Sequence, residues 1–190
     1  IITCGLAFPT TAAPIIQNRL IPVFVDCRLD TFNIDESALE KSVSSRTRAI
    51  QVTHTLGNPC DMEKITRFAN EHDLYLIEDA CDALGSKFDK KFVGSFGDIA
   101  TYSFYAAHHI TMGEGGAIAA SDKKLAGIIR SIRDWGRDCF CGDNSGLKGA
   151  CGKRFDYFIE EINSTYDHRY VYSDIGYNLK PTDIQSAIGV

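Results

Sequence analysis

The sequence has no excess of positive charge and no long apolar segment. Its 20 Lys and Arg residues are outnumbered by 25 Asp and Glu, for a formal net charge of -5 at pH 7. Nucleic-acid binding through phosphate contacts needs a basic surface, so this class of partner is excluded. Apolar runs such as residues 74–77 are far too short to span a bilayer, and no signal-like segment opens the chain. We therefore expect a cytoplasmic protein with no membrane partner.

The sequence also lacks internal repeats, low-complexity linkers and an even set of cysteines. Seven cysteines without an export signal argue against a disulfide framework and favour thiol chemistry or a metal in a reducing compartment. The 190 residues, 44% of them hydrophobic, suffice for one sizeable core. The chain starts in an apolar stretch without Met and stops in a helix-like run at 182–190, so we expect a fragment of a longer protein.

Short apolar runs alternate with segments of helical periodicity. Buried strands are predicted at residues 23–26, 49–53, 74–79 and 99–104. This alternation predicts an α/β fold with a mostly parallel sheet between helices. Residues 137–153 are rich in Gly, Cys and charge without any period, which predicts a loop that is not held by an apolar stripe.

Two helices are predicted from apolar periodicity and end signals. The first covers residues 59–71, with Asn58 as its cap and Pro59 in its first turn. Its inward face would consist of Met62, Ile65, Phe68 and Ala69. The second covers residues 121–133, after a strand that ends at Ala120. Its inward face would consist of Leu125, Ile128, Ile129 and Ile132.

The predicted strand at residues 74–79 ends in two carboxylates, Glu78 and Asp79. In open α/β sheets, ligands bind just outside the carboxyl ends of the strands. An aspartate there can hold a pyridinium nitrogen through a charge-assisted hydrogen bond and so keep a pyridoxal-type ring an electron sink. The alternative is a cap on the following helix. The hexapeptide alone favours that alternative.

Residues 101–116 read as a strand that runs into a polar, glycine-rich turn. Glycines let the backbone approach a ligand closely, and the Ser103 hydroxyl can donate to a phosphate. A single histidine is more often a core residue than a catalyst. His108 and His109 are adjacent, however, and cannot both point into a core. One of them is a candidate base near neutral pH.

Four segments together resemble the DegT/DnrJ/EryC1/StrS sugar aminotransferase family, which has the aspartate aminotransferase fold (fold type I). These segments are residues 77–80, 103–108, 113–116 and 176–178, and the resemblance covers nearly the whole chain. Ordinary members have, five residues after the matching serine, the lysine that forms a Schiff base with pyridoxal phosphate (PLP). This chain has His108 there. That exchange resembles the 3-dehydratase branch, which uses pyridoxamine phosphate (PMP).

Cysteines distinguish members within the 3-dehydratase branch, and the relevant ones in this chain are Cys81, Cys139, Cys141 and Cys151. From spacing alone, a metal cluster, a structural zinc site and unrelated buried thiols all remain open. The pattern resembles the four-cysteine [2Fe–2S] motif of the CDP-4-keto-6-deoxyglucose 3-dehydratases of lipopolysaccharide synthesis. This chain departs from the motif of those dehydratases at two points. The segment between Cys141 and Cys151 is two residues longer than usual, and Ala80 stands where those enzymes commonly have Asn. The other cysteines, Cys4, Cys27 and Cys60, are predicted to be small core residues.

The resemblance also implies a domain plan and partners. Residues 1–190 would be the central part of the cofactor-binding large domain, without its upstream phosphate loop and its C-terminal small domain, and 137–153 would be the cysteine-containing loop. Asn178 would reach the cofactor phosphate of the other subunit in a homodimer. Judged without the family, Asn178 could instead cap a helix before Thr182.

The implied reaction is the PMP-dependent C3 dehydration of a nucleotide-linked 4-keto-6-deoxyhexose, CDP-4-keto-6-deoxy-D-glucose, towards 3,6-dideoxysugars of lipopolysaccharide. His108 would take a proton from the cofactor methylene, Asp79 would hold the ring, and a flavin/iron–sulfur reductase would supply two electrons through the cluster. One alternative is a PLP-dependent sugar aminotransferase, although no lysine lies between Lys91 and Lys123. Another is an inactive relative that dimerises or senses a ligand.

Overall fold

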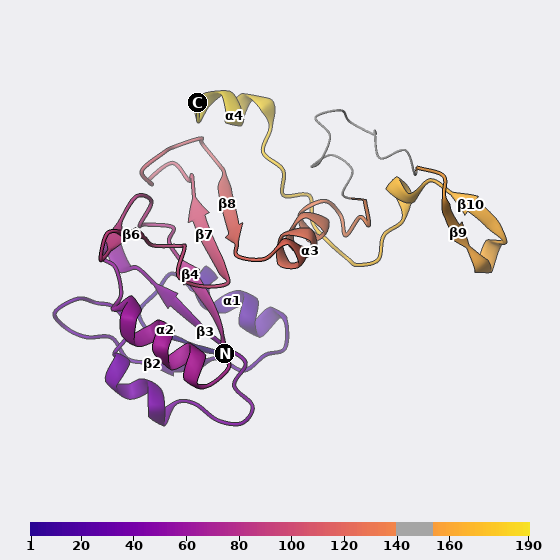
Figure 1. Cartoon of the computed structure of the whole chain (residues 1–190). Coiled ribbons are helices and arrows are strands. Elements are labelled where there is room, and N and C mark those ends of the chain that lie inside the picture. Colours follow the sequence, from indigo (N-terminus) through magenta and orange to yellow (C-terminus); the bar gives the residue numbers. More distant parts are fainter. Residues whose placement is uncertain (140–153) are drawn as a thin grey trace. The chain divides into compact units, whose positions relative to one another are not determined.

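The computed structural model describes residues 1–139 and 154–190, which form two compact units (Figure 1). The first unit contains Ile1–Ser121 and Asp183–Val190, and the second contains Asp122–Thr182. Among the helices of the described residues, none has both the length and the apolar character needed to cross a membrane.

A six-stranded sheet forms the centre of the first unit, with strand order β2-β1-β3-β4-β7-β8. All neighbouring pairs are parallel except β7 and β8. The strands are β1 (Ile2–Cys4), β2 (Val23–Val25), β3 (Ala49–Thr53), β4 (Tyr75–Asp79), β7 (Ile99–Ser103) and β8 (Gly116–Ala120). The strands predicted from apolar runs are thus confirmed to within one residue at each end, and so is the mostly parallel sheet.

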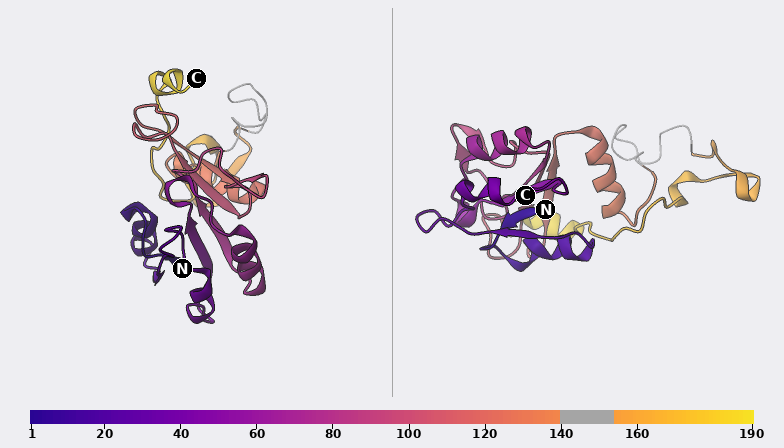
Figure 2. Two further views of the ribbon diagram at one scale, coloured as in Figure 1. Left: turned by 90° about the vertical axis from the view of Figure 1, so that its left-hand side faces the viewer. Right: turned by 90° about the horizontal axis from the view of Figure 1, so that it is seen from below.

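Two helices cover opposite faces of this sheet (Figure 2). Helix α1 (Pro9–Gln17) connects β1 to β2, and helix α2 (Met62–Glu71) connects β3 to β4. Strands β2 and β3 lie on opposite sides of β1, so the chain reverses its direction across the sheet there. Because crossover connections between parallel strands are right-handed, this reversal places the two helices on different faces.

Helix α2 buries the predicted face but begins later than predicted. Its N-cap is Asp61, whose carboxylate accepts the Lys64 N–H at 3.1 Å. Asn58 is not the cap, because the buried Asn33 side chain donates to the carbonyl oxygens of Asn58 and Pro59 and holds them outside the helix. The predicted inward residues are all buried in the main core: Met62, Ile65, Phe68 and Ala69.

The second unit contains helix α3 (Lys123–Arg133), which is capped by Asp122. Its predicted inward face is only partly covered, since Ile128 is 44% and Ile132 37% exposed. Within this unit the helix is joined to the segment 176–179 by backbone hydrogen bonds, in which Tyr177 and Leu179 donate to carbonyls at the helix end. Within the described residues, the burial predicted for these two isoleucines is therefore wrong.

Several short elements have no clear sequence signal. Two hairpins are formed by β5 (Lys87–Phe88) with β6 (Lys91–Phe92) and by β9 (Tyr157–Ile159) with β10 (Ser164–Tyr166). The described 3-10 helices are η1 (Glu36–Lys41), η2 (Thr55–Gly57), η4 (Glu160–Ile162) and η5 (His168–Tyr170). Helix α4 (Asp183–Ile188), in contrast, lies in the helix-like run predicted at residues 182–190.

Candidate active site

The two carboxylates at the end of β4 point to opposite faces of the sheet, as successive strand residues must. Glu78, on the α2 face, is fully buried and accepts backbone N–H groups of Gly94, Phe96 and Gly97 at 2.6–2.7 Å. Burial opposes its ionisation, but the hydrogen bonds from His54, Gly94 and Gly97 outweigh this and lower its pKa. Glu78 is therefore a buried carboxylate that anchors the loop at residues 94–97.

His54 completes this buried network. Its Nε2 lies 3.1 Å from the Glu78 carboxylate, and its Nδ1 accepts the Cys60 backbone N–H at 3.1 Å. An acceptor at Nδ1 places the ring proton on Nε2, where it can be donated to Glu78. Both side chains are inaccessible to solvent, so the network stabilises the fold beneath β4 and does not contact a ligand.

Asp79 lies on the other face, the one that α1 covers. Its Oδ2 accepts the Thr11 hydroxyl at 2.8 Å, and its Oδ1 accepts the Cys81 backbone N–H at 3.2 Å. Residues 81–85 form turns and not a helix. The interpretation of Asp79 as a helix cap is therefore wrong, and the carboxylate is held at the carboxyl end of a central parallel strand, where ligands of such sheets bind.

Ser103 ends β7 on the same face as Asp79. Asp79 is in register with Thr101, and Ser103 follows two residues later, so their side chains project to one side. The Ser103 Oγ accepts the Tyr105 backbone N–H at 3.2 Å, which leaves its own hydroxyl proton available to a ligand such as phosphate. In the following turn, Gly113 has a φ of 79°, a conformation that favours glycine.

His108 lies in this turn with its two ring nitrogens in different surroundings. Nε2 is 3.2 Å from the Asp82 carboxylate, whereas Nδ1 is buried and has no hydrogen-bond partner among the described residues. The carboxylate favours a proton on Nε2, which leaves the lone pair on Nδ1. His109, its neighbour, is exposed. The arrangement selects His108 over His109 as a candidate base, and Asp82 is a contact that the sequence did not indicate.

The predicted cluster ligands are only partly described. Cys81 and Cys139 are free thiols, Cys81 in the first unit and Cys139 in the second, while Cys141 and Cys151 lie outside the described residues. Burial and the Asp79 charge raise the pKa of Cys81 to about 12, so this thiol is protonated without a metal. Within residues 1–139 and 154–190 there is no group of three or more metal-ligating side chains. The [2Fe–2S] cluster stays a prediction.

The remaining cysteines behave as predicted for core residues. Cys4 and Cys60 are 3% and 0% exposed, and the half-buried Cys27 packs against the same core. Burial raises the pKa of the Cys60 thiol, which donates to the Thr53 carbonyl at 3.2 Å. These thiols are structural.

Asn178 belongs to the second unit and is exposed. Its Oδ1 accepts the Lys180 ammonium at 2.6 Å, and its backbone forms a bridge with Asp134. Because α4 begins at Asp183, Asn178 does not cap that helix. Its predicted contact with the cofactor phosphate of a second subunit stays a prediction.

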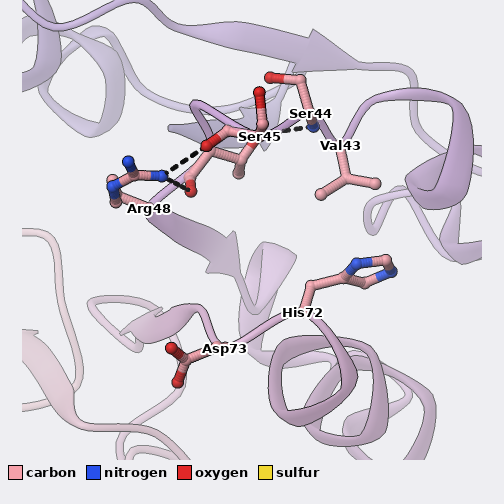
Figure 3. Close-up of a pocket in the computed structure, with 7 residues that line it drawn as sticks. Val43, Ser44, Ser45, Arg48, His72 and Asp73 are labelled. Carbon is pink, nitrogen blue, oxygen red and sulfur yellow. Dashed lines mark hydrogen bonds between the residues drawn. The ribbon is translucent and has the colours of Figure 1, made fainter.

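A pocket of about 360 Å³ lies at the opposite end of the parallel strands, beside the amino ends of β3 and β4 (Figure 3). The Arg48 guanidinium, its only arginine or lysine, donates to the backbone carbonyls of Ser45 and Thr47 at 2.8 Å. These bonds stabilise the turn before β3. The candidate catalytic groups lie instead at the carboxyl ends of β4 and β7.

The chain is similar to characterised and solved proteins over its whole length. It is 52% identical over 190 residues to the lipopolysaccharide biosynthesis protein RfbH of Salmonella typhimurium, covering 100% of this chain and 43% of that protein. It is 50% identical over 190 residues to the dTDP-4-dehydro-2,6-dideoxy-D-glucose 3-dehydratase of Saccharopolyspora spinosa, covering 100% of this chain and 41% of that protein. The chain thus spans less than half the length of these relatives.

The solved structures confirm the fold. The E. coli GDP-4-keto-6-deoxy-D-mannose-3-dehydratase with bound hydrated PLP superimposes with a TM-score of 0.80 at 29% identity, covering 99% of this chain and 46% of that chain. The family model described as the DegT/DnrJ/EryC1/StrS aminotransferase family matches residues 1–190. With the parallel sheet and the motifs at its carboxyl edge, these matches show that the chain belongs to the DegT/DnrJ/EryC1/StrS aminotransferase family.

Proposed function

We propose that the full-length protein dehydrates C3 of a nucleotide-linked 4-keto-6-deoxyhexose, CDP-4-keto-6-deoxy-D-glucose, with PMP as cofactor. The observation that carries this proposal is the His108 ring, whose buried Nδ1 has no partner among the described residues and whose other nitrogen faces Asp82. A histidine there can act as a base but cannot form a Schiff base. Relatives named as 3-dehydratases support the C3 dehydration, and one named for lipopolysaccharide biosynthesis supports a place in that process.

The residues at the carboxyl edge fit the cofactor. Asp79 would hold the ring nitrogen, Ser103 would donate to the phosphate, and Asn178 of the partner subunit would reach the same phosphate in a homodimer. The Asp79 oxygens already accept two hydrogen bonds, so the carboxylate is oriented before a ligand arrives. PMP, when bound, supplies an amino group that condenses with the C4 ketone and a ring that accepts an electron pair.

The proposed roles of the side chains follow from their atoms. His108 Nδ1 would take the proton from the cofactor methylene carbon, and Nε2 of the imidazole ring lies 3.2 Å from the Asp82 carboxylate. Asp82 thereby keeps the imidazole ring oriented. Asp79 would hold the protonated ring nitrogen, so that the bound ring could accept the electron pair left on the methylene carbon. The C3 hydroxyl would leave as water, with the proton that His108 had taken.

Replacing His108 in the full-length protein by Asn should lower kcat for C3 elimination by about 10²–10⁴-fold, because Asn cannot accept the proton. His109→Asn is the matched control, since its side chain is exposed and the same substitution there should leave kcat near the parental value. The assay follows consumption of CDP-, GDP- and dTDP-linked 4-keto-6-deoxyhexoses with PMP present. Equal activity of the two variants would contradict the role of His108, and amino transfer by the parent would favour an aminotransferase.

The elimination product needs two electrons to become a 3-deoxy sugar. We propose that a [2Fe–2S] cluster on Cys81, Cys139, Cys141 and Cys151 delivers them one at a time from a flavin/iron–sulfur reductase. Four thiolates suit such a cluster chemically, and coordination to iron would deprotonate the Cys81 thiol. The resemblance of the cysteine spacing to the dehydratase motif supports this assignment.

Cys139→Ser should separate the two stages of the reaction in the full-length protein. Because elimination precedes electron delivery, hydrogen exchange at the cofactor methylene should continue, whereas formation of the reduced 3-deoxy product with reductase present should be lost. Broad absorbance between about 400 and 600 nm should disappear with the cluster. Cys27→Ser, outside the motif, is the control and should retain both bands and product. A Cys139→Ser variant that forms deoxysugar at the parental rate would exclude the cluster assignment.

A further inference from the structure

The Asp79 carboxylate is held by a residue 68 positions away in the sequence. Thr11, in the first turn of α1, is 3% exposed, and its hydroxyl donates to Asp79 Oδ2 at 2.8 Å. This bond joins the helix on one face of the sheet to the end of β4. The second oxygen, Oδ1, accepts the Cys81 backbone N–H at 3.2 Å.

Three other threonines of the described residues have a buried hydroxyl oxygen but no such bond. The hydroxyl oxygens of Thr3, Thr53 and Thr66 are buried without a hydrogen-bond partner. Thr53 is in register with Asp79 on the adjacent strand and projects to the same face, yet its hydroxyl is unpaired. Thr11 alone among these four side chains donates to the carboxylate.

The two donors constrain the carboxylate in a way that one could not. A single hydrogen bond would let the carboxylate plane turn about the bonded oxygen, whereas bonds to both oxygens fix the plane between α1 and the turn after β4. An ionised carboxylate has about four lone-pair sites, so two remain for a ligand. Directed donors and acceptors are most effective when surrounding groups lock their orientation before the ligand binds.

We propose that Thr11 is a positioning residue that fixes the Asp79 carboxylate for its hydrogen bond to the pyridine nitrogen of the cofactor. This inference rests on the proposed function, because it assumes that a pyridoxamine-type ring binds at Asp79. Thr11 does not touch the reacting atoms; it acts through Asp79. A merely structural Thr11 would stabilise the packing of α1 without changing the bound ring.

The experiment uses full-length protein loaded with PMP labelled with ¹⁵N in the ring. Thr11→Val keeps the shape of the side chain and removes the hydroxyl, while Thr11→Ser keeps the hydroxyl. Thr66→Val makes the same change at a threonine of α2 whose buried hydroxyl oxygen has no partner among the described residues. For each variant the ¹⁵N chemical shift of the bound ring, the Kd for PMP and the melting temperature are measured.

In Thr11→Val we expect the ring-nitrogen shift to move towards that of the unprotonated ring and the Kd to rise about two- to tenfold, the range for one hydrogen bond. Thr11→Ser should restore both values, and Thr66→Val should match the parent. A Thr11→Val protein with a lower melting temperature but the parental shift and Kd would overturn the inference. If that variant does not fold, Thr11→Ser and Thr11→Ala, which differ by one oxygen atom, provide the same comparison.

The parent protein separates this inference from the proposed function. A parent that binds PMP with a protonated ring nitrogen supports the assignment of Asp79, and the Thr11 variants then test positioning alone. A parent that shows no protonated ring nitrogen overturns the Asp79 assignment and the role of Thr11 together.

Discussion

Replacing His108 by Lys in the full-length protein should convert the binding of PLP from non-covalent to covalent. Only a primary amine can form a Schiff base with the cofactor aldehyde, and the sequence has no lysine between Lys91 and Lys123. His108 follows Ser103, the predicted phosphate donor, in the turn after β7, so a lysine there would extend over the same edge of the sheet. The expected result is a Schiff-base absorbance band and a mass increase by one cofactor after borohydride reduction.

His109→Lys is the matched control for this experiment. It introduces the same amine one residue further along, on a side chain that is exposed, and should bind the cofactor without forming a covalent bond. If His108→Lys gave no band that borohydride removes, or if both variants reacted equally, His108 would not occupy the position of the cofactor lysine. The proposed function would then lose its main support.

Asp79→Asn should lower the rate of C3 elimination by about 10²–10³-fold, the usual effect of removing a group that stabilises charge in the transition state. A neutral amide cannot stabilise a protonated ring nitrogen, so the negative charge that develops on the methylene carbon would be less stabilised. The fold should change little, because the amide oxygen still accepts one of the two hydrogen bonds from Thr11 and Cys81. Elimination is measured by substrate consumption, and stability by thermal unfolding.

Asp98→Asn is a suitable control for a purely structural aspartate. Asp98 Oδ2 accepts the Leu76 backbone N–H at 2.8 Å near the start of β4, whereas Asp79 is the last residue of that strand. Its substitution should lower the melting temperature without reducing elimination by more than the loss of folded protein explains. Full elimination activity in Asp79→Asn, with only a loss of stability of about 1 kcal/mol from a weakened hydrogen bond, would show that Asp79 has a structural role and no chemical one.

Local patterns predicted much of the fold. Strand β3 lies at the residues that the apolar run indicates, and the buried face of α2 follows from its 3.6-residue period. The predicted start of α2 was wrong because the side chain that binds the backbone there is distant in the sequence. The Asn33 side chain, 25 positions before Asn58, binds the carbonyl that a helix start would have used. The apolar stripe of α3 likewise predicted burial that two of its isoleucines do not have.

The sequence by itself determined the parallel sheet, the family and the candidate residues Asp79, Ser103 and His108, because strand periodicity and contiguous motifs are local properties of the chain. Only the tertiary structure decided which partners those residues have. In the structure the Thr11 hydroxyl donates to Asp79, and the Asp82 carboxylate lies beside the His108 ring. Glu78, on the opposite face from Asp79, is buried with His54. These contacts depend on crossover handedness and on the direction in which each strand end points, and no spacing in the sequence records either.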